Sequence, residues 1–222
     1  MSQRPETATT DYLRLLAELV ERAKRRTYQL MHVQPGAAVL DVGCGPAIDT
    51  LALAELVGPH GKVAGVDTHQ DHVDSANDNA RAAGLADRVV HRVADATALP
   101  YANGEFDAVR SERVFQHIPN CAAALAEMAR VTKPGGWVVV LDTDWNTESY
   151  AIGDHDAGLY DIERRLVRYR AERFMVNGSV GRELLRQFTV QGLRELHVEL
   201  VPHFLTDYAL TRSVGFLDEV EA

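Results

Sequence analysis

Cysteine is scarce in this chain of 222 residues, which contains only Cys44 and Cys121 and no Cys-x-x-Cys pair. Two isolated cysteines do not provide the ligands of a structural zinc site or a framework of disulfides, and they are typical of a reducing compartment. The opening residues, MSQRPETATTDY, lack the apolar core of a signal peptide, and no apolar run approaches the ~20 residues of a membrane span. These absences predict a cytoplasmic protein without a membrane partner.

The chain also has fewer basic residues than acidic ones. The chain has 23 lysines and arginines against 32 aspartates and glutamates, which gives a net charge of −9. Because an acidic surface repels phosphate backbones, we expect no general nucleic-acid binding. The cluster of basic residues at Lys24–Arg26 is explained more simply as a solvated helix face. The length suits one domain with a real core, and the 46% apolar content is ordinary for a globular protein.

Strand-like and helix-like segments alternate through the middle of the chain. Runs rich in apolar and β-branched residues, typical of buried strands, are each followed by a segment with helical spacing of its apolar residues. The predicted strands are AAVLDV (37–42), KVAGVD (62–67), RVVHRVAD (88–95), FDAVRS (106–111) and WVVVLDTD (137–144). This alternation predicts an α/β fold, Rossmann-like and doubly wound, with a mostly parallel sheet.

Helical patterns also flank this region. An apolar stripe that starts near Asp11 predicts N-terminal helices, so we divide the chain into a helical cap, residues 1–35, and a main domain, residues 36–222. After the fifth predicted strand, residues 153–174 and 181–191 follow helical patterns and form a predicted helical insertion. The stretch LHVELVPHFLTDYAL, residues 196–210, reads as extended.

The ends of the first three predicted strands each carry an aspartate: Asp41, Asp67 and Asp95. Ligands of such sheets bind at the carboxyl ends of the strands, so these side chains should meet at one edge. Any one of them could be a solvated loop residue or a helix cap, but three in phase with the strand repeat favour a ligand site. An acid at Asp67 suits ribose hydroxyls, and one at Asp95 could accept from an adenine amino group.

The loop after the first strand, VLDVGCGPAIDT, distinguishes between two kinds of nucleotide cofactor. A dinucleotide site has the spacing Gly-x-Gly-x-x-Gly, but counting from Gly43 and Gly45 the third position is Ile48. A carboxylate at Asp41, ahead of the glycines, is also unusual beside a pyrophosphate. It suits a ligand that carries an ammonium or a sulfonium group, because opposite charges attract in a partly desolvated cleft.

Four segments in order, VLDVGCGPA, GVD, ADATALPYANGEFDAV and ARVTKPGGWVVV, resemble the class I S-adenosylmethionine-dependent methyltransferases. The similarity is strongest to the small-molecule group that includes the ubiquinone and menaquinone biosynthesis enzymes, and it covers roughly Val39 to Asp142. It implies that S-adenosylmethionine is the cofactor and assigns roles at the strand ends. The implied cofactor-binding residues are Gly43 and Gly45 for the methionine part, Asp67 for the ribose, Asp95 with Ala96 for the adenine, and Ser111 near the methionine moiety or the transferring methyl group. Asp41 and Thr68 are further predicted cofactor-binding residues.

The chain departs from the family pattern in two places. Ala47 stands where relatives usually have a third glycine, and Pro46 where they often have threonine or serine. The family sheet also closes with an antiparallel last strand, and here only residues 196–210 could supply one, so that strand is short or missing. An open sheet edge can be covered by a partner chain, which leaves a homodimer open.

Candidate catalytic and substrate residues follow the fourth and fifth strands. His117, in VFQHIPN, could act as a general base, although a packing or capping role explains it equally well. Asp142 is a second catalytic candidate, with Asp144 as its alternative, since residues two apart on an extended segment face opposite sides. Trp145 and Tyr150 could form an aromatic wall for the substrate. No metal site is predicted, because the fourth strand ends in Arg110 and Ser111 rather than in an acid.

These features predict a methyltransferase that acts on a small-molecule metabolite, at an oxygen, nitrogen or carbon acceptor that the sequence does not specify. An Asn-Pro-Pro-Tyr-like motif is absent and no cysteine is placed for attack on cytosine, which counts against nucleic-acid substrates. Two alternatives stay open. One is an NAD-dependent oxidoreductase, and the other is a non-catalytic member of the fold that binds a cofactor or serves as a scaffold.

Overall fold

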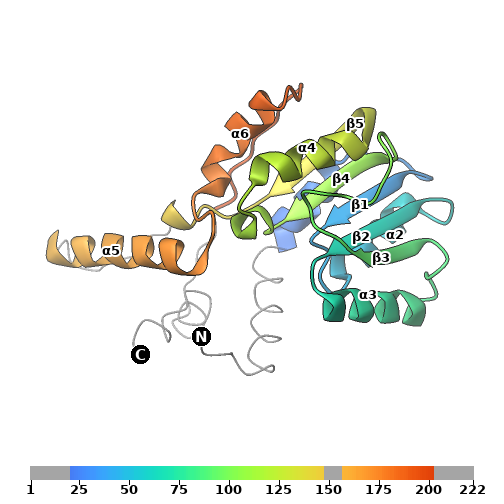
Figure 1. Ribbon diagram of the computed structural model, residues 1–222, viewed down its shortest axis with the longest axis horizontal. Helices are drawn as coiled ribbons and strands as arrows, with labels where there is room; N and C mark the ends of the chain where they lie inside the picture. The colour runs from blue at the N-terminus through green and yellow to red at the C-terminus, as the bar shows by residue number, and fades with distance from the viewer. Residues whose placement is uncertain (1–20, 148–156, 203–222) are drawn as a thin grey trace. The chain divides into compact units, whose positions relative to one another are not determined.

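The computed structural model describes residues 21–147 and 157–202 (Figure 1). Contacts divide the chain into two units, Thr27–His197 and a second made of Met1–Arg26 with Val198–Ala222. In the second unit the guanidinium of Arg26 binds the carboxylate of Glu199 through both Nε and Nη2. Among the described residues, no helix is long and apolar enough to cross a membrane.

A sheet of five parallel strands forms the centre of the larger unit, in the spatial order β3-β2-β1-β4-β5. The strands are β1 (Ala38–Val42), β2 (Lys62–Asp67), β3 (Val89–Val93), β4 (Phe106–Glu112) and β5 (Thr132–Leu141). The chain runs outward from β1 to β3, then returns to the other side of β1 for β4 and β5. This reversal beside β1 creates the switch point where ligands of open α/β sheets bind.

Helices cover both faces of this sheet (Figure 1). Buried apolar residues of α2 and α3 pack on one face, and those of α4 and α6 pack on the other. The helices of the larger unit are α2 (Ile48–Val57), α3 (Gln70–Ala82), α4 (Cys121–Val131), α5 (Ala157–Phe174) and α6 (Val180–Val190), with the short 3-10 turns η1 (Phe115–His117) and η2 (Trp145–Thr147). The chain therefore has the doubly wound, Rossmann-like α/β fold that the strand and helix alternation predicts.

The predicted helices and strands differ from the observed ones mainly at β5. We expected this strand to begin at Trp137, after a stop at Lys133–Gly136, whereas it already begins at Thr132. Thr132 pairs with Phe106, and Trp137 pairs with Ala108, so the extra residues between them form an irregularity in the ladder. Glycine and proline here interrupt the register rather than the strand.

The closing strand stays an untested expectation. In the sheet of the described residues β5 is an edge, and 196–202 form no strand. The rest of the predicted extended stretch, 203–210, lies outside the described part of the chain. No later strand is described, so the prediction that α5 and α6 form an insertion before a last strand is not tested. The predicted domain boundary at residue 36 also stays a prediction.

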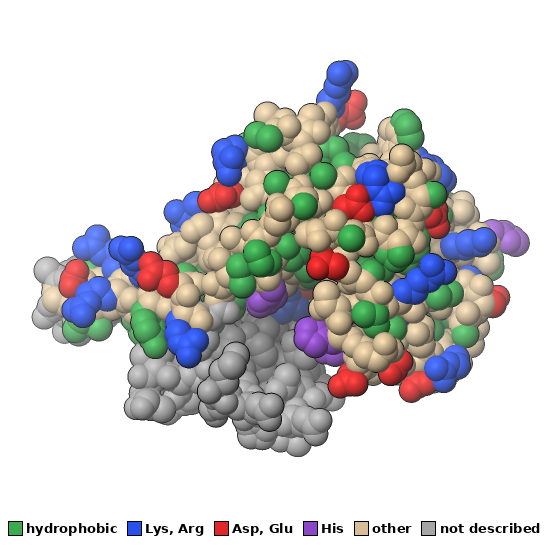
Figure 2. All heavy atoms as spheres, viewed as in Figure 1, with side chains coloured by type: hydrophobic (Ala, Val, Ile, Leu, Met, Phe, Trp, Pro, Cys, Tyr) green, Lys and Arg blue, Asp and Glu red, His purple; other side chains and the backbone are tan. Residues whose placement is uncertain are grey.

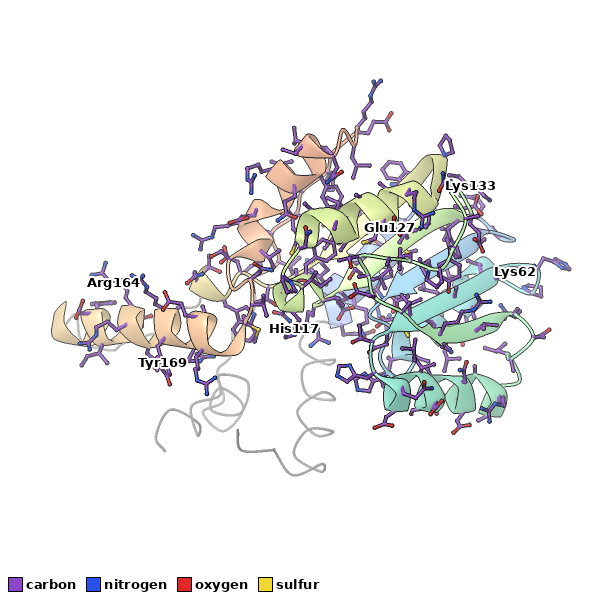
Figure 3. All side chains as sticks on the ribbon, viewed as in Figure 1. Lys62, His117, Glu127, Lys133, Arg164 and Tyr169 are labelled. Carbon is purple, nitrogen blue, oxygen red and sulfur yellow. The ribbon has the colours of Figure 1, made fainter. Side chains whose placement is uncertain are left out.

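The two ends of the sheet are easily distinguished (Figure 3). Lys62 and Lys133 mark the amino ends of β2 and β5, and His117 lies toward the opposite edge, just beyond the carboxyl end of β4. The predicted site residues that the structure describes lie at or shortly after the carboxyl ends of strands, so the larger unit brings them to one edge.

Candidate cofactor site

The loop after β1 has a backbone that requires glycine. Gly43 and Gly45 adopt φ angles of +78° and +50°, in the left-handed region. A Cβ on Gly43 would lie 2.1 Å from Cγ2 of Val114, so a larger residue has no room there. The N–H groups of Gly43 and Cys44 donate to the carbonyl of Val66, at 2.7 and 2.9 Å, and hold the loop against β2. A Cβ on Gly45 would meet no atom of the described residues within 4 Å, so these residues leave open space beside the loop at this point.

Ala47 adopts a left-handed backbone conformation that favours glycine. Its φ is +76° and ψ is +21°, and its side chain is fully buried at the N-cap of α2. A left-handed backbone costs an alanine about 1–2 kcal/mol, so the loop is strained at this residue. The helix begins at Ile48, so Pro46 lies before its first turn.

Asp67 closes the loop from the neighbouring strand. Its Oδ2 accepts the N–H of Gly45 at 3.1 Å, and its Oδ1 accepts the N–H of His69 at 3.0 Å. Burial alone would raise the pKa of Asp67, but these two N–H groups and the neighbouring His72 outweigh it and lower the pKa. The carboxylate is thus ionised at neutral pH, at the end of β2 and directly beside the open space at Gly45.

Three further predicted cofactor residues surround this point. Asp95 is exposed beyond β3, and its Oδ1 accepts both the N–H and the hydroxyl of Thr97 at 2.7 Å, which lowers its pKa. Ala96 is buried beside it. Thr68 is exposed, and its hydroxyl lies 3.2 Å from Nδ1 of His69. The roles of these residues in binding stay predictions.

Asp41 lies in a buried ionic network that the sequence analysis missed. Its carboxylate accepts from Nη1 of Arg110 at 3.2 Å, and the two residues are register partners on β1 and β4. Arg110 is fully buried, also pairs with Asp49 and Glu112 at 3.3 and 2.7 Å, and lies over the ring of Tyr28. Burial would lower the pKa of Arg110, but the three carboxylates raise it instead. We call these five residues the buried ionic cluster.

Ser111 follows Arg110 on β4 and faces the opposite side of the sheet. Its side chain is 1% exposed, and its hydroxyl has no hydrogen-bond partner within the described residues. A buried hydroxyl normally has a partner, so an unpartnered one marks a place where a ligand can supply it.

The catalytic candidate His117 ends the 3-10 turn η1 and is exposed. Surrounding protein atoms and the nearby guanidinium of Arg113 lower the pKa of His117, so its imidazole is neutral at pH 7. The second candidate, Asp142, lies under the same turn, where its Oδ2 accepts the N–H of Phe115 at 2.8 Å and its Oδ1 the N–H of Thr143 at 2.9 Å. Burial raises the pKa of Asp142 to about 6. Its hydrogen bonds position η1, and its catalytic role stays a prediction.

Gln116, which the sequence analysis overlooked, ties this turn to the segments after β5. Its side-chain oxygen accepts from the indole N–H of Trp145, and its main-chain carbonyl accepts the N–H groups of Val176 and Asn177 at 3.0 and 2.9 Å. The predicted substrate residue Trp145 therefore contacts Gln116, the residue that directly precedes His117. Tyr150, its predicted partner, lies outside the described residues. Asp144 is turned to α6, where it pairs with Arg182.

The family model for a methyltransferase domain matches residues 34–170, more than half of this chain. The chain belongs to the methyltransferase family. An uncharacterised 37.1 kDa protein from a transposon of Streptomyces fradiae is 33% identical over 186 residues, which are 82% of this chain and 52% of the relative. Demethylmenaquinone methyltransferase of Bacillus cytotoxicus is 37% identical over 124 residues, 56% of this chain and 52% of the relative.

The fold of this chain also matches a solved structure. A SAM-dependent methyltransferase from Aquifex aeolicus superposes with a TM-score of 0.67 at 20% identity, over 90% of this chain and 94% of that one. The resemblance seen in the four sequence segments is thereby confirmed at the level of family and fold. The chain spans about half the length of the curated relatives it matches.

A cavity of about 880 Å³ adjoins the methyltransferase fold between α5, η2 and the loop before α6. Its walls include apolar side chains such as Val167 and Met175 and charged side chains of both signs. Among these, Arg168 pairs with Glu172 and Arg182 pairs with Asp144. Figure 2 shows basic side chains gathered along α5 on the visible face. Val176 also lines this cavity, and its N–H binds Gln116, so the cavity is linked to the turn that carries His117.

Proposed function

We propose that this chain binds S-adenosylmethionine at the carboxyl ends of β1 to β4 and transfers its methyl group to a small-molecule metabolite, at an oxygen, nitrogen or carbon acceptor. One observation carries the proposal: the ionised carboxylate of Asp67 is held against Gly45, at the point where the loop leaves open space. A carboxylate in this position can accept hydrogen bonds from two ribose hydroxyls. The names of the relatives, methyltransferases of small molecules among them, support the same reaction.

The residues present fit this cofactor in three respects. Gly45 has no atom where a Cβ would lie, which leaves room for a ligand against the backbone. Ser111 offers a buried hydroxyl that lacks a partner in the described residues. Asp95 keeps one carboxylate oxygen that forms no hydrogen bond with Thr97, so it can accept from an adenine amino group.

Asp41 belongs to the buried ionic cluster, where Asp49 and Glu112 share the guanidinium of Arg110 with it. The proposal assigns to Asp41 the positively charged methionine part of the cofactor, because opposite charges attract in a partly desolvated cleft. In this cluster Asp41 acts together with its neighbours rather than as an isolated carboxylate.

S-adenosylmethionine supplies a methyl group that its sulfonium has already activated. The task of the protein is then to align an acceptor with that methyl group and to keep water away from it. A neutral imidazole at His117 can accept a proton from an acceptor that must lose one. Asp142 fixes the turn that presents this imidazole, and Trp145 joins the turn to the segment after β5.

The cavity beside α5 is the proposed substrate site. Its lining combines apolar side chains with the charged side chains of both arginines and glutamates, so it suits a small molecule that has apolar and polar groups. We expect no binding of nucleic acid. A cytoplasmic location, the division into a cap of residues 1–35 and a domain of residues 36–222, and a homodimer stay predictions.

Titration calorimetry of the purified chain with S-adenosylmethionine, S-adenosylhomocysteine and NAD tests the proposal. Binding of the first two ligands with one site per chain, and no heat with NAD, is the expected result. Heat with NAD alone would favour an oxidoreductase instead. If no ligand binds, the non-catalytic scaffold becomes the better interpretation of the fold.

A further inference from the structure

Two histidines at the start of α3 point their ring nitrogens at the same oxygen of Asp67. The Nδ1 atoms of His69 and His72 each lie 3.3 Å from Oδ1 of Asp67. The ligand atoms of the three residues all lie within 4.8 Å of one another, and the two imidazole rings are 5.1 Å apart between centroids. His69 and His72 are one turn apart at the beginning of the helix, so the backbone holds this arrangement.

We propose that Asp67, His69 and His72 bind one divalent transition-metal ion, of which Zn²⁺ is the best fit. Zinc bonds of about 2.1 Å in a tetrahedron place neighbouring ligand atoms about 3.4 Å apart. Both nitrogen–oxygen distances already match this edge, and only the two nitrogens must approach each other. Two imidazoles and one carboxylate are ligands that zinc accepts, and such a set leaves a fourth position for water or for a ligand.

The surroundings allow an ion to enter and allow the ligands to adjust. The side chains of His69 and His72 are 73% and 45% exposed, whereas that of Asp67 is 12% exposed. The site is therefore open on the histidine side and anchored on the carboxylate side. Oδ1 of Asp67 also accepts the N–H of His69, which orients the oxygen and still leaves it a lone pair for a metal.

The same carboxylate has two uses in this interpretation. Resting on the proposed function, we infer that metal and S-adenosylmethionine exclude each other, because the ribose hydroxyls and the ion both require oxygens of Asp67. Linkage makes this reciprocal: metal weakens cofactor binding by the factor by which cofactor weakens metal binding. The site would then act as a point of inhibition by free zinc.

The experiment titrates ZnCl₂ into the metal-free full chain, without an affinity tag, and follows the heat of binding. Replacing Zn²⁺ with Co²⁺ gives visible absorption bands that report tetrahedral coordination by nitrogen and oxygen. We expect one ion per chain, and a loss of affinity of about tenfold or more when His69 and His72 are both replaced by alanine. His60→Ala, an exposed histidine on a turn elsewhere, is the matched control and should leave the affinity unchanged.

Two results would overturn the proposal. Equal zinc affinity in the chain and in its double variant would place the ion elsewhere, and simultaneous binding of zinc and S-adenosylmethionine would refute their competition. A cofactor titration with a chelator present keeps the two proposals apart, since it tests the cofactor site without metal. If the cofactor fails to bind there while zinc still binds through the histidines, the proposed function fails and the metal site stands.

Discussion

The polar residues at the strand ends fall into two regions with opposite exposure. The buried ionic cluster, with Arg110 at its centre, lies beneath the glycine loop, where the arginine side chain is 1% exposed and Asp41 is 3% exposed. Asp67 and Asp95 lie at the outer edge, where hydrogen bonds from N–H groups lower their pKa values. The aspartates at the carboxyl ends of β1, β2 and β3 thus have different partners.

This difference suggests that the buried carboxylates stabilise the fold, whereas those at the open edge are available to bind a ligand. A buried carboxylate with an arginine partner contributes to stability only as long as both are present, and losing either leaves an uncompensated charge. A carboxylate at the open edge costs the fold little to keep, and its remaining oxygens are available to a ligand. Substitutions in the first region should therefore change the free energy of unfolding, and those in the second should change affinity.

Replacing Arg110 with methionine should have the largest effect. The change leaves three carboxylates without their shared cation in a buried place, and we expect a loss of about 3–5 kcal/mol in the free energy of unfolding. Denaturant unfolding followed by circular dichroism measures it. Arg113→Met is the control, because Arg113 pairs with the same Glu112 from a more exposed position and should cost at most about 1 kcal/mol. Equal losses in the two variants would show that burial of the cluster does not matter.

His91 is a buried polar residue of the same inner region, and it predicts a pH dependence. Its ring lies between Thr50 and Asn77, at 2.8 and 3.1 Å, and burial lowers its pKa from 6.5 to about 4. Between pH 6.5 and pH 4 the imidazole of His91 is protonated in the unfolded chain but stays neutral in the folded chain. Stability from this group is therefore complete above pH 6.5 and falls by about 1.4 kcal/mol per pH unit as the pH drops toward 4.

The His91→Gln variant isolates this contribution. The difference in free energy of unfolding between the chain and the variant should shrink as the pH falls from 6.5 to 4, and should be constant above pH 7. Asp142 titrates in the same range with the opposite sign, because burial raises its pKa to about 6, but it is present in both proteins and cancels. A difference that does not vary with pH would show that His91 is already charged or already solvated in the folded chain.

At the open edge, the main effect of Asp67→Ala should be on affinity, although the variant also removes the acceptor of the N–H groups of Gly45 and His69. It removes the acceptor of two ribose hydroxyls, so binding of S-adenosylmethionine should weaken by about tenfold or more. Calorimetric titration gives the affinity, and the unfolding midpoint shows whether the variant is folded. Asp74→Ala, an exposed aspartate of α3 that pairs with Gln70, should bind like the parent chain. Unchanged affinity in the Asp67 variant would remove the basis of the ribose assignment.

Much of the larger unit follows from local patterns. The buried stripe Val73, Ala76 and Ala80 and the stop at Gly84 predict α3, and the structure shows the three residues buried and a positive φ at that glycine. The alternation of strands and helices likewise predicts the parallel sheet. These signals are short-range, since periodicity and turn chemistry act within one element. The early start of β5 escapes them, because it depends on pairing with β4.

The site is less predictable because its partners are distant in sequence. Nothing near Asp41 indicates that Arg110, 69 residues later, will neutralise it, since the contact depends on the register of β1 and β4. Gln116 and Asn177 meet through a similarly distant contact. The histidines of Asp67-Thr-His-Gln-Asp-His are different. Two histidines one helical turn apart, beside an aspartate, are a local sequence signal for the proposed metal site, and the sequence analysis passed over it.

The smallest effect lies in the loop that joins the two regions, at the position where relatives have a third glycine. Ala47→Gly removes the strain of a left-handed alanine, which stabilises the fold by about 1–2 kcal/mol. The variant also loses a buried methyl group and gains freedom in the unfolded chain, and each of these changes destabilises the fold by about 1 kcal/mol or less. The free energy of unfolding should therefore stay within about 1 kcal/mol of the parent. Ala54→Gly, an equally buried alanine inside α2, has no strain to relieve and should lose about 2 kcal/mol. Denaturant unfolding curves of the two variants test this prediction. If both variants lose the same free energy of unfolding, the left-handed conformation of Ala47 carries no strain, and a glycine at this position would matter for ligand binding rather than for stability.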